Sequence, residues 1–334
     1  MIYNFMDMPA EKYYDNKKEC EKRNDMLNNK NNQYIATVKN DGEWACFIYN
    51  ADKTLVVRSR SISKVTNKYG DFTAKVPHLV EEFKKIFKPG TVVLGELCFD
   101  DPTKTSKDVG TILRCLPDKA VERQKTNPLS LKCFDILEDA DSGNLLKTPY
   151  INRLTLLTTK LASSTSAYIS CTQIFLSNFI ENAEEIWSKG GEGLVIQRKN
   201  NEYEPGKRTA WHTLKLKKTL GEVEVPIIGI QAPTYEYTGD SPDTWKFKDE
   251  NGKNITKFAY YNWAGAILVD YKGTRVSISS GLNDEDRAYL NSDEGLEAIR
   301  KQNLIAVINA MEEDPVSGSL RHPIVVRIRQ KENM

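Results

Sequence analysis

The sequence has little that would place it in a membrane, a metal cluster or a disulfide framework. No apolar run approaches the roughly 18 residues that a membrane-spanning helix needs, and the N-terminus is polar and charged, without an apolar signal region. Histidine occurs only 3 times, too rarely and too scattered for a histidine metal cluster. The 6 cysteines include no C-x-x-C pair. We therefore expect reduced core thiols in a cytoplasmic protein.

An excess of charge of one sign is also missing. The 47 basic and 46 acidic residues leave a net charge of +1, which removes the simplest indication of nucleic-acid binding, a strongly basic chain. The charge is nevertheless segregated, because bases gather between residues 198 and 218 while acids gather at 284–286 and 312–314. This asymmetry predicts one basic surface suited to phosphate on an otherwise neutral protein.

The length of 334 residues suggests two domains, at roughly 100–200 residues each. Residues 33–218 alternate between strand and helix signals, which predicts an α+β domain with helices packed outside hairpin-like strands. We expect residues 103–116 to form a long loop with a short helix, and the polar residues 1–32 to be helical or loosely ordered. The remaining strands are predicted at 33–39, 44–50, 55–60, 91–99, 131–137, 194–197 and 213–217, and the helices at 79–87, 151–161 and 179–187.

The pattern changes near residues 219–222, which divides the chain into a first domain at 1–220 and a second at 221–334. One acidic helix is expected at 283–290, capped by Ser280 or Asn283. Five short strands with an inserted helix predict a small β-barrel of the oligonucleotide-binding (OB) type. These strands are expected at 223–231, 266–271, 275–279, 304–311 and 324–329.

Five short segments of the first domain carry residue types suited to phosphate chemistry. Taken alone, each has an ordinary structural interpretation: a turn, a solvated strand position or a core aromatic. The two lysines of the last segment share one face of a strand, because strand side chains alternate. The segments are Lys39-Asn40-Asp41-Gly42, Leu94-Gly95-Glu96-Leu97, Phe134-Asp135-Ile136-Leu137, Gly191-Glu192-Gly193-Leu194-Val195-Ile196 and Leu214-Lys215-Leu216-Lys217.

Together, these segments supply the groups that covalent nucleotidyl transfer needs. A free lysine is protonated at neutral pH, so nearby cations have to lower its pKa before it can attack phosphorus. Carboxylates can hold a divalent cation that neutralises a triphosphate and its leaving pyrophosphate. An aromatic ring can stack on the base.

In this order, the segments resemble those of the nucleotidyltransferase superfamily of ATP-dependent DNA ligases, RNA ligases and capping guanylyltransferases. The resemblance is greatest to the small DNA ligases encoded by bacteriophages, and it covers residues 34–334. The segment Ser319-Leu320-Arg321-His322-Pro323-Ile324-Val325-Val326-Arg327 looks like the C-terminal barrel motif of DNA ligases. Residues 203–208, which precede the paired lysines Lys215 and Lys217, also resemble the segment at that place in DNA ligases. The resemblance implies an adenylation domain, a nucleotidyltransferase domain of ATP-grasp-like type, followed by an OB-fold domain.

The resemblance also implies roles for individual residues. Lys39 would be the nucleophile that forms a lysyl-adenylate, in a turn shaped by Asp41 and Gly42, and Phe134 would stack on adenine. Glu96 and Glu192 would bind the metal, Mg²⁺ or Mn²⁺. ATP would be contacted by Thr37, Val38, Arg60, Glu96, Phe134, Lys215 and Lys217. DNA or pyrophosphate would be contacted by Arg208, Arg321, Arg327 and Arg329.

The sequence departs from the family pattern in three places. DNA ligases commonly carry an arginine five residues after the lysine, where this chain has Trp44. The contact of that arginine is lost or supplied by another base, such as Arg58 or Arg60. The family's Ser-Arg-Asn-Gly pattern is altered at Ser61-Ile62, and the closing Asp-Lys of cellular ligases is absent after Arg329.

The resemblance implies an ATP-dependent DNA ligase that seals nicks in duplex DNA through a lysyl-AMP and a DNA-adenylate. We expect a monomer in the cytoplasm, or in the host cytoplasm if the protein is phage-encoded, with no membrane partner. Two alternatives stay open. One is an RNA ligase or a capping guanylyltransferase on the same scaffold. The other is a catalytically inactive protein that binds nicks.

Overall fold

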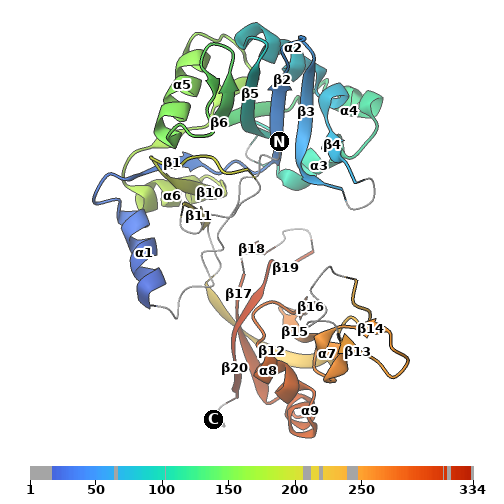
Figure 1. Cartoon of the computed structure of the whole chain (residues 1–334). Coiled ribbons are helices and arrows are strands. Elements are labelled where there is room, and N and C mark those ends of the chain that lie inside the picture. The colour runs from blue at the N-terminus through green and yellow to red at the C-terminus, as the bar shows by residue number, and fades with distance from the viewer. Residues whose placement is uncertain are drawn as a thin grey trace. The chain divides into compact units, whose positions relative to one another are not determined.

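The computed structural model describes residues 17–63, 67–101, 103–205, 212–217, 221–238, 247–310, 312–313 and 317–331. The chain divides into two compact units, Met1–Lys217 and Lys218–Met334 (Figure 1). Residues 218–220, next to the expected domain boundary, lie outside the described residues. No helix in the described part of the chain is long and apolar enough to cross a membrane.

The larger sheet of the first unit is mixed, with the strand order β4-β3-β2-β5-β6-β7 and with β8 parallel to β6. Both of its faces are covered. Along β2, for example, Ala45 and Phe47 pack into one apolar cluster, while Trp44 and Cys46 pack into another. The strands are β2 (Glu43–Tyr49), β3 (Leu55–Ile62), β4 (Tyr69–Asp71), β5 (Thr91–Cys98), β6 (Ser130–Asp139), β7 (Gly143–Asn144) and β8 (Ile169–Cys171).

Helices cover the Phe47 face of this sheet, where Leu79, Val109 and Leu157 join the same cluster. The expected short helix within 103–116 is α3, which Thr105 and Asp108 begin with a reciprocal capping box. A helix directly after it, α4, was not predicted. These helices are α2 (Pro77–Ile86), α3 (Ser106–Leu113), α4 (Pro117–Arg123) and α5 (Tyr150–Ala162), with a 3₁₀ turn at Thr73–Lys75.

The smaller sheet of the first unit is antiparallel, with the order β11-β10-β1-β9. One face is covered by α1 and α6, because Met26 and Phe179 pack with Ala36 and Leu194. Side chains alternate along the strands, so the residues between these core positions project from the opposite face. The elements are α1 (Lys17–Asn28), β1 (Tyr34–Val38), β9 (Ile174–Phe175), α6 (Phe179–Ser188), β10 (Gly193–Arg198) and β11 (Thr213–Lys217).

The second unit contains a five-stranded antiparallel sheet with the order β16-β15-β12-β17-β20. All five predicted strands are present. They are β12 (Glu222–Gln231), β15 (Ala266–Tyr271), β16 (Thr274–Ile278), β17 (Leu304–Asn309) and β20 (Ile324–Gln330). Two small hairpins are formed by β13 (Phe247–Lys248) with β14 (Asn254–Ile255), and by β18 (Glu312–Glu313) with β19 (Leu320–Arg321).

The prediction of a single helix in this unit was wrong. The expected helix is α8 (Asp284–Leu290), and its cap is Asn283, one of the two residues predicted for that position. A second helix, α9 (Asp293–Arg300), follows at once because Ser292 caps a new N-terminus. A short helix, α7 (Lys257–Tyr260), has Thr256 as its N-cap.

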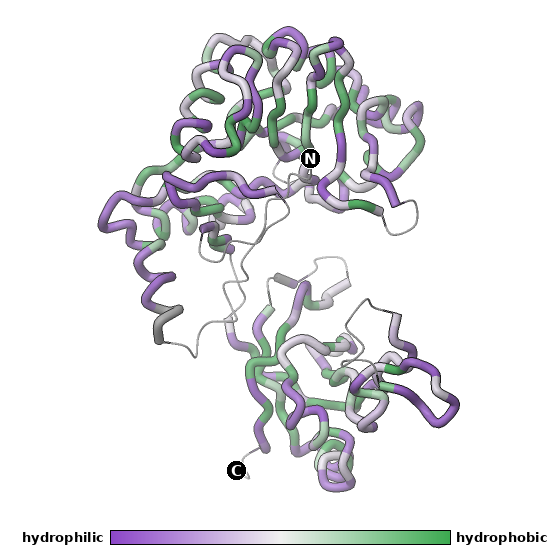
Figure 2. The backbone as a smooth tube through the Cα atoms, in the orientation of Figure 1, coloured by the Kyte–Doolittle hydropathy of each residue, from purple (hydrophilic) through white to green (hydrophobic). Residues whose placement is uncertain are grey.

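Hydrophobic segments gather on the strands, and hydrophilic segments on the connecting turns and outer helices (Figure 2). The thiols follow this division, since Cys46, Cys98 and Cys133 are buried and Cys115 and Cys171 are partly exposed. These five cysteines, the ones whose side chains the structure describes, form no disulfide with one another.

Candidate active site

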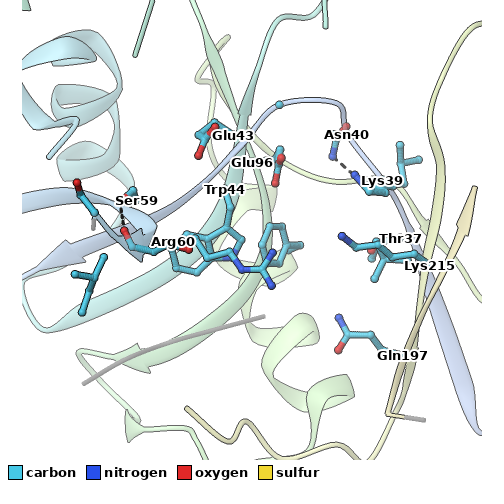
Figure 3. Close-up of a pocket in the computed structure, with 17 residues that line it drawn as sticks. Thr37, Lys39, Asn40, Glu43, Trp44, Ser59, Arg60, Glu96, Gln197 and Lys215 are labelled. Atoms are coloured by element: carbon cyan, nitrogen blue, oxygen red, sulfur yellow. Dashed lines mark hydrogen bonds between the residues drawn. The ribbon is translucent and has the colours of Figure 1, made fainter. Parts of the chain in front are cut away.

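A pocket of about 460 Å³ lies in the first unit, a size typical of small-molecule sites. Its wall comes from both sheets: the face of the smaller sheet opposite α1 and α6, and the face of the larger sheet that carries Trp44. In Figure 3, Thr37, Gln197 and Lys215 face Trp44 and Arg60 across the cavity. Lys39 and Gly42 line it, together with six of the seven residues predicted to contact ATP: Thr37, Val38, Arg60, Glu96, Phe134 and Lys215. The seventh, Lys217, is not among the lining residues.

Strand register places these side chains. Thr37 on β1, Val195 on β10 and Lys215 on β11 are directly opposite one another in a single row across the smaller sheet. In the larger sheet, Trp44 on β2 lies opposite Glu96 on β5. Residues directly opposite in a sheet share a face, so each sheet presents a continuous row of side chains to the pocket.

Lys39 and Lys217 bind the same carboxylate. The Nζ of Lys39 lies 2.5 Å from Oε2 of Glu192, and the Nζ of Lys217 lies 2.5 Å from Oε1. Burial raises the pKa of the Glu192 carboxyl, but the two ammonium groups together outweigh burial and hold that pKa below its ordinary value. Glu192 is therefore an ionised anchor that sets the position of the Lys39 amine.

The backbone directly after Glu192 requires a glycine. Gly193 has a φ of +134°, and a Cβ added there would stand 2.0 Å from the Leu216 carbonyl oxygen, so only glycine fits. The Lys39 N–H donates to the Gly193 carbonyl at 2.8 Å, and the indole N–H of Trp187 donates to the Glu192 carbonyl at 3.1 Å. These contacts join the residue that follows β1, Lys39, to the segment that leads into β10 and carries Glu192.

The turn that follows Lys39 is equally constrained. A Cβ at Gly42 would lie 2.2 Å from the Leu97 carbonyl oxygen, so the turn approaches β5 more closely than a side chain allows. The Asn40 amide donates to the Thr172 hydroxyl at 3.0 Å, and that hydroxyl donates to the Val38 carbonyl at 3.1 Å. The turn therefore holds Lys39 at a defined place on the pocket wall.

Glu96 has the opposite electrostatic character to Glu192. Burial raises its pKa to about 8, with a further increase from the Glu192 carboxylate, against the lowering effects of Lys39 and Lys215. Without a bound metal cation beside it, the Glu96 carboxyl is therefore largely protonated at neutral pH. A cation bound beside it would favour the ionised form.

The donors present fit a hydrated Mg²⁺ better than a metal held by protein alone. The described residues contain no group of three or more His, Cys, Asp or Glu side chains placed to hold a metal. Glu192 is nevertheless close enough to Glu96 to raise the pKa of the Glu96 carboxyl. Mg²⁺ commonly binds one or two carboxylates together with substrate phosphates and water, so this pair suits it.

Phe134 reaches the pocket because β6 is irregular there. Leu94 lies opposite Asp135 and Gly95 lies opposite Cys133, so the register shifts by one residue at Phe134. Such a bulge redirects a side chain. Behind it, Arg153 forms a buried double hydrogen bond to the Asp135 carboxylate at 2.8 and 2.9 Å, and the Tyr150 hydroxyl donates to the Phe134 carbonyl at 3.1 Å.

Several lining residues had not been assigned a role from the sequence. They are Asn40, Glu43, Trp44, Ser59 and Gln197. Trp44 had been noted only as a departure from a family pattern. It is 7% exposed and packs in a cluster that also contacts Phe134. Alternation along β10 was the signal available for Gln197, which stands two residues beyond Val195 on the same face.

The residues predicted to contact DNA or pyrophosphate are not among those that line this pocket. Arg208 lies outside the described residues. Arg321, Arg327 and Arg329 belong to the second unit. There Arg327 lies 3.1 Å from Glu222, and Arg329 lies 2.6 Å from Glu224.

The chain belongs to the ATP-dependent DNA ligase domain family, whose model matches residues 17–217. A DNA ligase of Thermococcus fumicolans is 29% identical over 202 residues, which cover 58% of this chain and 34% of that protein. DNA ligase 2 of Methanosarcina mazei is 26% identical over 292 residues, or 80% of this chain and 48% of that protein. The chain thus spans about a third to a half of the length of these relatives.

Solved structures share the fold. Pmar-Lig_PreS3 superimposes with a TM-score of 0.64 and 19% identity, covering 97% of this chain and 67% of that one. A structure from a structure–function study of Lig E DNA ligases gives a TM-score of 0.57 at 17% identity, covering 89% of this chain and 93% of that one.

Proposed function

We propose that this chain is an ATP-dependent DNA ligase that seals nicks between a 5′-phosphate and a 3′-hydroxyl in duplex DNA. The observation that carries the proposal is the Lys39 amine, held 2.5 Å from Glu192 at the wall of a pocket of nucleotide size. Family membership supports the same activity. The second unit and the Arg321 segment favour a DNA ligase over the other nucleotidyltransferases.

The proposed first step transfers AMP to the protein. The deprotonated Nζ of Lys39 attacks the α-phosphorus of ATP, an N–P bond forms, and the bond to the bridging oxygen of pyrophosphate breaks. Lys215 and Lys217 bind the charge that develops on the α-phosphate, while Phe134 stacks on adenine. Such phosphoryl chemistry depends mainly on alignment and charge neutralisation, which the strand register of this pocket supplies.

Two further transfers complete the proposed reaction. The 5′-phosphate at the nick attacks the phosphorus of the lysyl-AMP, and the resulting DNA-adenylate frees the Lys39 amine. The 3′-hydroxyl then attacks the 5′-phosphorus, forms the phosphodiester and releases AMP. Arg60, which lines the pocket, is proposed to contact nucleotide and phosphate in these steps.

Glu96 and Glu192 are the proposed metal ligands, for Mg²⁺ or Mn²⁺. A bound divalent cation would neutralise triphosphate charge and stabilise the leaving pyrophosphate. The protein's part is to keep Glu192 ionised through its lysines, and to provide in Glu96 a carboxyl that releases its proton when a cation binds.

The second unit is proposed to be an OB-type barrel that clamps the duplex. Its strands β12, β15 and β16 form a meander, β17 returns beside β12, and α8 and α9 lie between β16 and β17 in the chain. This is the order expected of a partly open five-stranded barrel. Arg327 and Arg329 would exchange their glutamate partners for phosphates, so binding should be salt-sensitive and independent of DNA sequence.

The proposed protein is a monomer that acts on nicked DNA in the cytoplasm, because one active site and one DNA clamp suffice for the reaction. The test is incubation of the full chain with α-labelled ATP or GTP and Mg²⁺, followed by a denaturing gel. Label from ATP alone, chased by nicked DNA into a sealed strand, is the expected result. Label from GTP would indicate a capping enzyme, and nick binding without any label would indicate an inactive binding protein.

A further inference from the structure

Gln197 presents a buried amide to the nucleotide pocket with no partner in the described part of the chain. The residue is 5% exposed, lines the cavity and has no side-chain hydrogen bond to any described residue. Figure 3 shows its amide directed into the cavity, on the side of Thr37 and Lys215 that is away from Lys39. A buried amide without partners is unfavourable, and it has both donors and an acceptor to offer. Its position therefore suggests that a ligand satisfies it.

The strand register places Gln197 at the base end of the pocket. Lys39 follows β1, and Glu192 precedes β10, so the reacting groups stand at one end of the antiparallel strands. Gln197 lies toward the other end of β10, opposite Ile35. A base stacked on Phe134 above Val195 would point one edge along β10, toward the Gln197 amide.

An amide matches the base edge of adenine. The 6-position of adenine carries an amino donor beside ring-nitrogen acceptors, and the Gln197 amide has an acceptor for the amino group and donors for a ring nitrogen. We propose that Gln197 is a specificity-determining residue that accepts a hydrogen bond from the 6-amino group of adenine, so that the pocket prefers ATP to a purine nucleotide without that group.

This inference rests on the proposed adenylylation of Lys39, so its test measures that step with nucleotides that differ only in the base. The full chain is incubated with ATP, GTP or purine riboside 5′-triphosphate, which lacks the 6-amino group, and the rate of protein labelling is measured against nucleotide concentration. Two variants are compared. Gln197→Met keeps the shape and removes both hydrogen-bonding groups, while Gln197→Glu keeps an acceptor for the amino group.

For Gln197→Met we expect the KM for ATP to rise roughly tenfold, as for the loss of one or two buried hydrogen bonds, with little change in the maximal rate. The preference for ATP over purine riboside triphosphate should largely disappear. Gln197→Glu should retain that preference, even if its charge weakens all three nucleotides equally. Thr213→Val is the matched control, because Thr213 lies opposite Gln197 on β11 and does not line the pocket.

An unchanged ratio of ATP to purine riboside triphosphate in both Gln197 variants, with wild-type labelling intact, would overturn the inference. Failure of the wild-type chain to be labelled by any nucleotide would instead count against the proposed function. Thermal unfolding of each variant separates a misfolded protein from a selective one. If Gln197→Met fails to fold, the ratio measured with Gln197→Glu decides, because loss of the ATP preference there would contradict the retained acceptor.

Discussion

The Nζ of Lys39 lies 2.5 Å from the carboxylate of Glu192, so the proposed nucleophile is held by the residue proposed to bind metal. Lys39→Ala should therefore abolish labelling of the protein by ATP, while binding of nicked DNA stays largely intact. A gel assay with α-labelled ATP measures the first, and a nick-binding assay the second. Lys189→Ala is the control, since that lysine also pairs with a glutamate but is 70% exposed. Labelling of the Lys39 variant would mean that another residue is the nucleophile.

Glu96 should make stability depend on pH. Its pKa is about 8 in the folded protein against an ordinary value of 4.5, so between these values the folded state holds a proton that the unfolded state has lost. The free energy of unfolding then decreases as pH rises through this window. In metal-free buffer, we expect the decline in Tm from about pH 5 to about pH 8 to be shallower in Glu96→Gln than in wild type. Parallel curves for the two proteins would contradict the raised pKa.

Arg153 should affect the pocket indirectly, through Asp135 and the neighbouring Phe134. Its ion pair with Asp135 is buried, at 2% and 1% side-chain exposure, directly after the bulge that carries Phe134. Removing one partner of such a pair leaves an uncompensated buried charge, and Arg153→Met should lower the free energy of unfolding by about 3–5 kcal/mol. The KM for ATP should rise as Phe134 loses its support. Urea unfolding and labelling kinetics measure the two effects.

The control for Arg153 is an exposed ion pair of the same unit. Lys88 and Asp141 are 68% and 56% exposed, and Lys88→Met should change stability by less than about 1 kcal/mol. Equal effects of the two substitutions would mean that burial of the Arg153 pair has no special importance for the pocket.

Trp44 should be required for the shape of the pocket. Trp44→Ala leaves a cavity beside Phe134 and should lower the free energy of unfolding by about 3–5 kcal/mol, with weaker ATP binding. Trp44→Phe keeps an aromatic ring and should have a smaller effect on both. Leu116→Ala, at a residue 71% exposed, is the control. If Trp44→Ala had full stability and an unchanged KM for ATP, the ring would not be part of the pocket wall.

Much of the fold was predictable because its strands are buried on one or both faces. The strands at 33–39, 91–99 and 194–197 were confirmed as β1, β5 and β10, and each carries the apolar residues that such burial demands. The short strands β8 and β9 were missed, since two or three residues show no periodicity. The helix α9 was missed because its start, at Ser292, directly follows the end of α8.

The sequence by itself determined the kinds of chemistry available and the order of their segments: a lysine turn, two carboxylates in strand segments, an aromatic and paired lysines. It also placed glycines beside Lys39 and Glu192, at positions 42 and 193, but only the structure shows that no Cβ fits there. Only the tertiary structure decided which side chains share the pocket. Pairing between strands far apart in the chain places Trp44 opposite Glu96. It also turns Gln197 toward the cavity. Local propensity does not encode such register, because it is set by burial on the opposite faces of both sheets.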